Sequence, residues 1–91
     1  MSTRVDDPDS VTPKLTEQEY KERLRELPPS AKLVAKVLET DGPLPQGDLA
    51  EESLLPDRTV RYALNRLEDN GLVEARYSLT DARKQVYTLA L

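Results

Sequence analysis

The sequence predicts a mainly α-helical domain that ends in a β-hairpin, which places it in the α+β fold class. Two observations lead to this prediction. From residue 15 to residue 70 the apolar side chains recur every three or four residues, which is the period of an α-helix. After residue 71 apolar and polar side chains alternate, which is typical of strands. With 91 residues the chain is one small domain, which we expect to span residues 15–91.

The N-terminal part of the chain predicts an arm and a helix. Residues 1–14 are polar and carry two prolines, so we expect a flexible arm. The first helix is predicted over residues 15–27, where Thr16 caps the helix and Glu19 completes a capping box. Its narrow apolar stripe packs either on the chain's own domain or on the same helix of a second copy. The stripe consists of Tyr20, Leu24 and Leu27.

Two shorter amphipathic segments predict the next two helices. The second helix is predicted over residues 30–40 and ends at an Asp-Gly-Pro turn. The third is predicted over residues 46–53, with Leu49 and Ala50 toward the core, and a Leu-Leu-Pro sequence ends it. The apolar face expected for residues 30–40 consists of Leu33, Val34, Val37 and Leu38.

The fourth helix is predicted over residues 57–70. Asn70-Gly71 supplies a left-handed stop at its C-terminal end. Its core stripe follows helical spacing and consists of Val60, Ala63, Leu64 and Leu67. At about 100° per residue, this stripe turns another set of side chains away from the core. The outward set is Arg58, Tyr62, Asn65 and Asp69, flanked by Arg61 and Arg66.

The last twenty residues predict the hairpin. A Thr-Asp-Ala-Arg-Lys turn joins two strands, and we expect the segment 79–85 to form the exposed tip. In the first strand the residues Val73, Ala75, Tyr77 and Leu79 alternate with polar ones, and in the second Tyr87, Leu89 and Leu91 alternate with Val86, Thr88 and Ala90.

Composition excludes several classes of function. The chain has no Cys and no His, so it has no disulfide, no thiol nucleophile and no imidazole base. We therefore expect neither a metal site nor a cofactor, and no enzyme, since no nucleophile–base pair is visible. No apolar run is long enough to cross a membrane, and the polar N-terminus does not resemble a signal peptide. These observations predict a cytoplasmic protein without a membrane partner.

Charge is unevenly distributed along the chain. It carries 13 basic and 17 acidic residues, for a net charge of −4. Residues 1–56 hold 7 basic and 12 acidic residues, net −5, whereas residues 57–91 hold 6 basic and 5 acidic residues, net +1. We expect the acidic first part to face away from whatever the second part contacts. The acidity suits a halophile's cytoplasm and equally suits an ordinary acidic protein.

Double-stranded DNA is the partner that this arrangement favours. A short turn after a two-turn helix makes the following helix protrude, and such a helix fits the major groove. Arginine can pair with guanine there, and asparagine with adenine. The alternative for the three arginines is an ordinary solvated helix face, on which Arg61 pairs with Asp57. The alternative for Tyr62 is a partly buried aromatic ring at the edge of the helix.

The stretch "LPQGDLAEESLLPDRTVRYALNRLEDNGLVEAR" resembles the winged helix-turn-helix of MarR-like transcription regulators. The similarity covers residues 28–91, less specifically at its first helix. The resemblance implies that the helix at 57–70 reads the major groove and that the 79–85 wing lies near the minor groove. It adds Thr59, Arg83 and Lys84 to the DNA-binding candidates, because Asp81-x-Arg83 resembles the wing signature. The full set is Arg58, Thr59, Arg61, Tyr62, Asn65, Arg66, Arg83 and Lys84.

The chain also departs from the MarR pattern. Leu54 replaces the small residue common in the turn, and we expect it to pack against a neighbour. MarR proteins dimerise through long N- and C-terminal helices, and here only the N-terminal one is present. The resemblance therefore implies a homodimer through Tyr20, Leu24 and Leu27, and no small-molecule effector. Together with the acidity, it suggests a haloarchaeal member.

A second class of function competes with DNA binding. Winged helices also serve as protein–protein interaction modules in transcription or replication assemblies, and fold alone does not decide between the two. The acidic surface favours such a module. The basic outward face of residues 58–66 and the wing favour DNA, and we take the DNA-binding regulator as the leading hypothesis.

Overall fold

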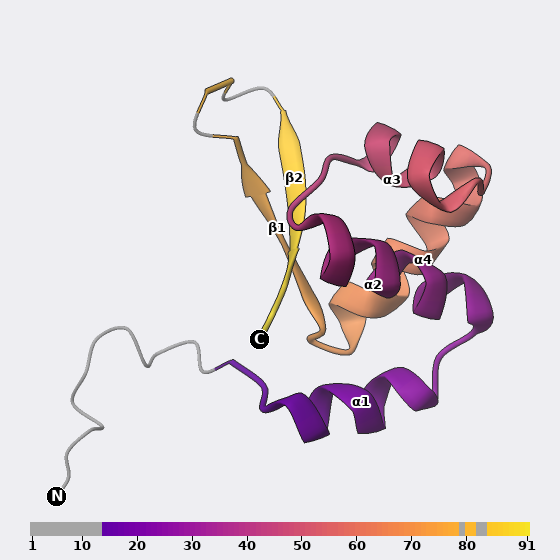
Figure 1. Cartoon of the computed structure of the whole chain (residues 1–91), viewed down its shortest axis with the longest axis vertical. Coiled ribbons are helices and arrows are strands. Elements are labelled where there is room, and N and C mark those ends of the chain that lie inside the picture. The colour runs from indigo at the N-terminus through magenta and orange to yellow at the C-terminus, as the bar shows by residue number, and fades with distance from the viewer. Residues whose placement is uncertain (1–13, 79, 82–83) are drawn as a thin grey trace, which may run out of the picture.

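A computed structural model describes residues 14–78, 80–81 and 84–91 of the chain. The described residues form four helices followed by an antiparallel hairpin, which confirms the predicted fold class (Figure 1). Every predicted helix is present, with bounds within two residues of the expected ones. The elements are α1 (Glu17–Arg25), α2 (Pro29–Asp41), α3 (Gln46–Ser53), α4 (Asp57–Asp69), β1 (Val73–Tyr77) and β2 (Gln85–Leu89).

The start of α1 is fixed by the capping box that the sequence predicts. The backbone N–H of Glu19 donates to Thr16 Oγ1 at 3.1 Å, and the backbone N–H of Thr16 donates to Glu19 Oε1 at 3.0 Å. Two donors that a helix start leaves unpaired are thereby satisfied. The hydrogen bonds from Thr16 lower the pKa of the Glu19 carboxyl below its usual value.

The apolar stripe of α1 packs on the chain's own domain. Tyr20 and Leu27 are only 3% and 5% exposed and belong to the core, while Leu24 is half-buried. The Tyr20 hydroxyl donates to Glu39 Oε2 at 2.8 Å. Burial raises the pKa of Tyr20, and the contact with Glu39 raises it further. Arg23 Nη1 donates to the backbone carbonyl of Asn70 at 2.9 Å. The expectation that this stripe faces a second copy is therefore wrong for Tyr20 and Leu27, because one chain already buries both.

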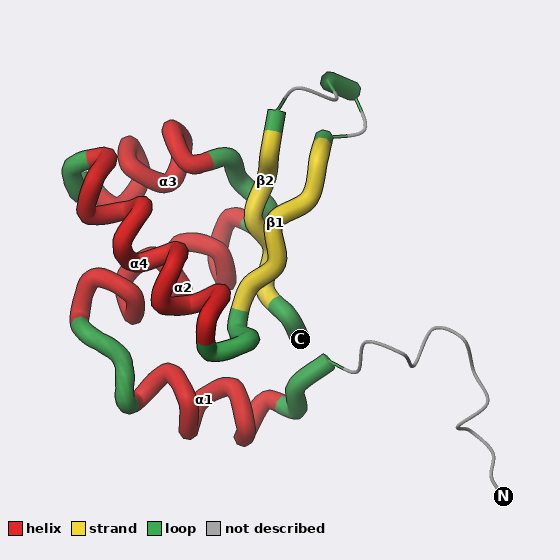
Figure 2. Tube along the Cα trace, turned by 180° about the vertical axis from the view of Figure 1, so that it is seen from behind, coloured by secondary structure: helices red, strands yellow, loops and turns green. Residues whose placement is uncertain are grey.

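Helix α2 lies at the centre of the core and packs against α4, α3 and β2 (Figure 2). Its buried residues are Ala31, Val34, Ala35 and Leu38. The buried face of α2 differs from the predicted one, since Leu33 was expected to be buried but is 40% exposed. Two alanines occupy the inward positions instead, and their small side chains let a neighbouring helix approach closely. Apolar spacing alone did not distinguish the two faces, because alanine carries little hydrophobic signal.

The turn between α3 and α4 contains a strained leucine. Leu54 ends α3 in the left-handed region, at φ 62° and ψ 24°, and its side chain is 88% exposed. The expectation that Leu54 packs against a neighbour is therefore wrong. The backbone N–H of Leu54 donates to the carbonyl of Ala50 at 2.9 Å, which closes the helix end. A leucine here carries a conformational cost that glycine avoids.

Helix α4 buries the predicted stripe completely. Val60, Ala63, Leu64 and Leu67 are at most 1% exposed. At its C-terminal end, Asn70 Nδ2 donates to the carbonyl of Arg66 at 2.8 Å. Gly71 follows at φ 72°, as the Asn-Gly pair predicts. The chain then leaves the helix and enters β1 two residues later.

The hairpin pairs in the register Val73 with Leu89 through Tyr77 with Gln85. Leu44 forms an additional bridge to Tyr87, through hydrogen bonds of 3.2 Å and 2.9 Å, which the sequence did not predict. Tyr77 shares the alternation of Val73 and Ala75 but is 66% exposed, because the hairpin extends beyond the helices that cover its base. Leu79 lies outside the described residues.

The alternation does not match burial after β2. Leu91 is 39% exposed, whereas Ala90 is only 8% exposed. The backbone N–H of Ala90 donates to the carbonyl of Leu72 at 2.8 Å, and its carbonyl accepts from the N–H of Leu15 at 3.0 Å. The end of the chain thereby joins the start of α1. No helix among the described residues is long and apolar enough to span a bilayer.

Leu54 yields a stability prediction. Replacing Leu54 by Asn should raise the free energy of unfolding by about 1 kcal/mol, since asparagine tolerates the left-handed region and the exposed leucine contributes little packing. Leu54→Val should lower it by a similar amount, because β-branched residues tolerate this region least. Urea denaturation of the two variants and the wild type measures both effects. A loss of stability in Leu54→Asn would show that the leucine side chain makes a stabilising contact.

Candidate nucleic-acid interface

The buried stripe of α4 determines which side chains the helix presents outward. Because Val60 and Leu64 point into the core, the opposite face of the first three turns is open to solvent. Four of the predicted DNA-binding residues are exposed on it, and Tyr62 is 48% exposed. Those four are Arg58, Arg61, Tyr62 and Asn65. Thr59 and Arg66 are half-buried at the flanks of this face.

The exposed side chains on the outward face of α4 are not engaged in hydrogen bonds or ion pairs with the described residues. In the described part of the molecule, the side chains of Arg58, Arg61, Tyr62 and Asn65 make no hydrogen bond and no ion pair. The alternative interpretation, in which Arg61 pairs with Asp57, is not realised. The guanidinium groups and the amide are therefore available to an external partner. Their donors match the acceptors on the base edges and phosphates of DNA.

The N-terminal end of α4 is held against α3. Gln46 Nε2 donates to the backbone carbonyl of Asp57 at 3.4 Å, and the two helices pack along their apolar sides. The backbone N–H groups of Thr59 and Val60 donate to the carbonyl of Pro56 at 3.0 Å each. These contacts set the angle at which the first turn of α4 protrudes. The arginines on that turn are thereby carried by a fixed segment of backbone.

The tip of the hairpin supplies a second set of candidates. Lys84 is exposed, and its carbonyl accepts from the N–H of Ser78 at 2.8 Å. The N–H of Lys84 donates to the carbonyl of Asp81 at 2.9 Å, which closes the turn. Arg83, the candidate for the minor groove, lies outside the described residues.

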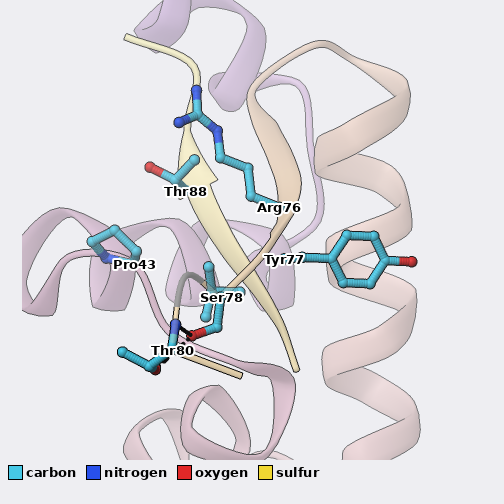
Figure 3. Close-up of a pocket in the computed structure, with 7 residues that line it drawn as sticks. Pro43, Arg76, Tyr77, Ser78, Thr80 and Thr88 are labelled. Carbon is cyan, nitrogen blue, oxygen red and sulfur yellow. Dashed lines mark hydrogen bonds between the residues drawn. The ribbon is translucent and has the colours of Figure 1, made fainter. Parts of the chain in front are cut away.

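Tyr77 is an exposed aromatic residue that the sequence analysis did not name among the DNA-binding candidates. It lies on the hairpin face that also carries Ala75 and the half-buried Tyr87, and Figure 3 shows its ring pointing away from the other labelled residues. Burial raises the pKa of Tyr87, the Glu68 carboxylate adds to this, and Arg61 of α4 opposes it. This face therefore lies beside α4. The only sequence signal for Tyr77 was its place at the end of a strand.

The opposite face of the hairpin carries a shallow hollow of about 400 Å³ (Figure 3). Arg76 lines it and pairs with Glu74 at 3.3 Å, so this arginine is already neutralised within the chain. Pro43 and Thr88 complete one side of it. Among the described residues, no group of three or more acidic side chains could hold a metal ion. The candidate interface thus consists of the outward face of α4, the hairpin face that lies beside α4, and the tip of the hairpin.

Comparison with known proteins agrees with this geometry. Residues 35–74 match the family model described as winged helix-turn-helix DNA-binding, which covers α3, α4 and most of α2. No curated protein of matching sequence was found. Several solved structures have a similar fold, including proteins that were crystallised on DNA.

Three of these structures illustrate the range of the similarity. The reduced form of AbfR bound to DNA is 27% identical, with a TM-score of 0.62 over 79% of this chain and 54% of that one. The S. aureus MepR–DNA complex is 21% identical, with a TM-score of 0.64 over 80% and 62%. The PcaV transcriptional regulator from Streptomyces coelicolor, in complex with its natural ligand, is 20% identical, with a TM-score of 0.66 over 79% and 52%.

This chain therefore spans between about half and three-fifths of the length of these three proteins. The family match includes α4, the helix that follows the turn, and ends at residue 74, within β1. The chain has the winged helix-turn-helix fold, and its residues 35–74 are similar to the DNA-binding domains that share this fold.

Proposed function

We propose that the chain is a DNA-binding transcription regulator that places α4 in the major groove and the hairpin tip near the minor groove. The observation that carries this proposal is the outward face of α4. Two arginines, a tyrosine and an asparagine lie there together, exposed and without partners in the described part of the chain. They lie on the helix that a winged helix-turn-helix presents to DNA.

The side chains divide into two roles. Arg58, Arg61 and Asn65 have the donors that pair with guanine and adenine in the major groove. Tyr62 is placed for base or sugar contact beside them. The remaining candidates fit contacts with the backbone, which position the protein without reading sequence. They are Thr59, Arg66, Lys84 and Arg83, to which the exposed Tyr77 is added.

Several finer predictions from the sequence remain proposals. The haloarchaeal origin and the cytoplasmic location rest on composition and resemblance alone. We also retain the prediction that the chain has no small-molecule effector. The PcaV structure contains a natural ligand, and DNA binding by the similar Bordetella bronchiseptica BpsR is regulated by 6-hydroxynicotinic acid. Calorimetry with 6-hydroxynicotinic acid would check whether this chain binds it.

Base readout by α4 is tested by single substitutions. Arg61→Ala or Asn65→Ala should weaken binding to the preferred site by about 1–3 kcal/mol and relax the sequence preference. Lys32→Ala removes one positive charge from α2 and serves as the matched control. Fluorescence anisotropy on specific and random duplexes measures both properties. If both α4 variants bind both duplexes like the wild type, α4 does not read bases.

The wing is tested by its salt dependence. Removing Arg83 and Lys84 together by alanine substitution should weaken binding to all sequences. The slope of log K against log salt should fall by about 0.9 for each phosphate that these two side chains neutralise in the wild type. The measurement is a titration of DNA binding over a wide range of salt concentration. An unchanged slope would mean that the hairpin tip does not contact phosphate.

A homodimer also remains a proposal. Two copies would place two α4 helices on half-sites about 34–36 Å apart, which matches one turn of DNA. Since Tyr20 and Leu27 are buried in their own chain, a dimer would have to form through surface outside the predicted stripe. Sedimentation velocity at tens of micromolar, with and without a palindromic duplex, should show two copies. A monomer under both conditions would contradict the dimer.

A further inference from the structure

A second basic surface lies on the part of the chain where sequence analysis expected acidity. Helices α1 and α2 border a shallow, open hollow of about 270 Å³, which we call the α1–α2 groove. It is lined by Lys21, Leu24, Arg25, Lys32 and Lys36. It shares Lys21, Leu24 and Lys36 with an adjoining hollow of about 340 Å³ that reaches the end of the chain at Leu89 and Leu91.

The cations of the groove are largely unpaired. Lys36 pairs with Glu39 at 3.3 Å. Over the described residues, the side chains of Lys21, Arg25 and Lys32 make no hydrogen bond and no ion pair. The pairing of Glu17 with Lys21, available at helical spacing, is not formed. Lys21 and Arg25 also border a hollow with Glu17 and Glu22, but the described residues form no ion pair there. The groove cations Lys21, Arg25 and Lys32 are thus free to attract an anionic partner.

The floor of the groove is apolar. Leu24 is half-buried at its centre, and the aliphatic stems of the lysines line its walls. The adjoining hollow adds the half-buried Leu89 and Leu91, which is 39% exposed. Apolar side chains of a partner could pack on these leucines, while its acidic side chains contact the positively charged rim.

The groove lies away from the α4 interface. Helix α2 packs on α4 through its buried face, and Lys32 and Lys36 are turned from that face toward α1. Helix α2 lies in front of α4 in Figure 1 and behind it in Figure 2, so the two surfaces belong to different sides of the molecule. A ligand on α4 would leave the groove open.

We propose that the α1–α2 groove binds an acidic, amphipathic helical segment of a partner protein. Its cations are spaced by four residues on both walls, Lys21 with Arg25 on α1 and Lys32 with Lys36 on α2. Carboxylates at i and i+4 of a helix are separated by a similar distance. A helix lying between the two walls could place acidic side chains on both rims and apolar ones on Leu24.

The chemistry of the groove favours a peptide over a nucleic acid. A continuous polyanion would run from the four cations toward Glu17 and Glu39, which line the adjoining hollow and would repel it. A nucleic acid backbone also has no apolar side chain for the leucine floor. A peptide can place acidic residues on the groove cations and continue with apolar residues over the adjoining hollow, so it fits both hollows.

The test uses a model peptide and the full-length chain. The probe is a capped, fluorescent peptide of about fifteen residues, with leucines at i, i+4 and i+7 and glutamates on both sides of them. A second peptide has lysine in place of every glutamate, and a third has the same composition in permuted order. Anisotropy titrations should show at least about tenfold tighter binding of the acidic amphipathic peptide than of either control peptide.

Charge reversal identifies the site. Lys21→Glu combined with Lys32→Glu should weaken binding of the acidic peptide by about tenfold or more, because two attractive contacts become repulsive. Lys14→Glu, an exposed lysine before α1 and outside the groove, is the matched control. Circular dichroism checks that each variant is folded. Amide shifts on peptide addition should be confined to α1, α2 and the end of β2.

The result also separates this proposal from DNA binding. The affinity for the peptide should be the same with and without duplex DNA, and it is measurable even if the chain binds no DNA. Equal binding of all three peptides, or no effect of the double reversal, would overturn the proposal. Protection of the groove by DNA would also overturn it, since a nucleic acid would then be the occupant. Self-association that the double reversal abolishes would overturn it as well, since the occupant would then be a second copy.

Discussion

The packing of α4 on α2 is the contact on which the rest of the structure depends. Val60, Ala63, Leu64 and Leu67 fill the core side of α4, and small alanines on α2 let the two helices approach. In a domain this small, few other residues could replace that burial. The stripe also fixes how α4 is rolled about its axis. The same four side chains therefore hold the fold together and direct Arg58, Arg61 and Asn65 to the outside.

Polar contacts rather than a broad apolar face secure α1. Tyr20 donates to Glu39, Arg23 donates to the carbonyl of Asn70, and the N–H of Leu15 joins the carbonyl of Ala90. The contact of Arg23 places a positive charge at the C-terminal end of α4, where the helix dipole favours it. Helix α1 is thereby linked to the C-terminal end of α4 and to the backbone that follows β2. Its unused cations then face α2 and create the groove.

The distribution of charge follows from this arrangement. A net charge of −4 does not describe either surface that the two proposals use. Arginines lie on α4 without acidic partners in the described residues, and lysines gather again between α1 and α2. Interaction with a partner depends on the local field within about 10 Å in physiological salt, rather than on the net charge. An acidic chain can therefore present two basic surfaces that lie on different sides of the molecule.

By itself the sequence determined the helices, the hairpin and the outward face of α4, because their signals are local. Periodicity, the capping box and the Asn-Gly stop each act within a few residues. Tertiary structure alone decided that Tyr20 and Leu27 belong to their own core, that Leu33, Leu54 and Tyr77 are exposed, and that Leu44 joins the sheet. It also brought Lys21 and Lys32 together. These outcomes depend on packing between segments that are distant in the sequence. Such packing produces no pattern among neighbouring residues, so the local sequence does not reveal it.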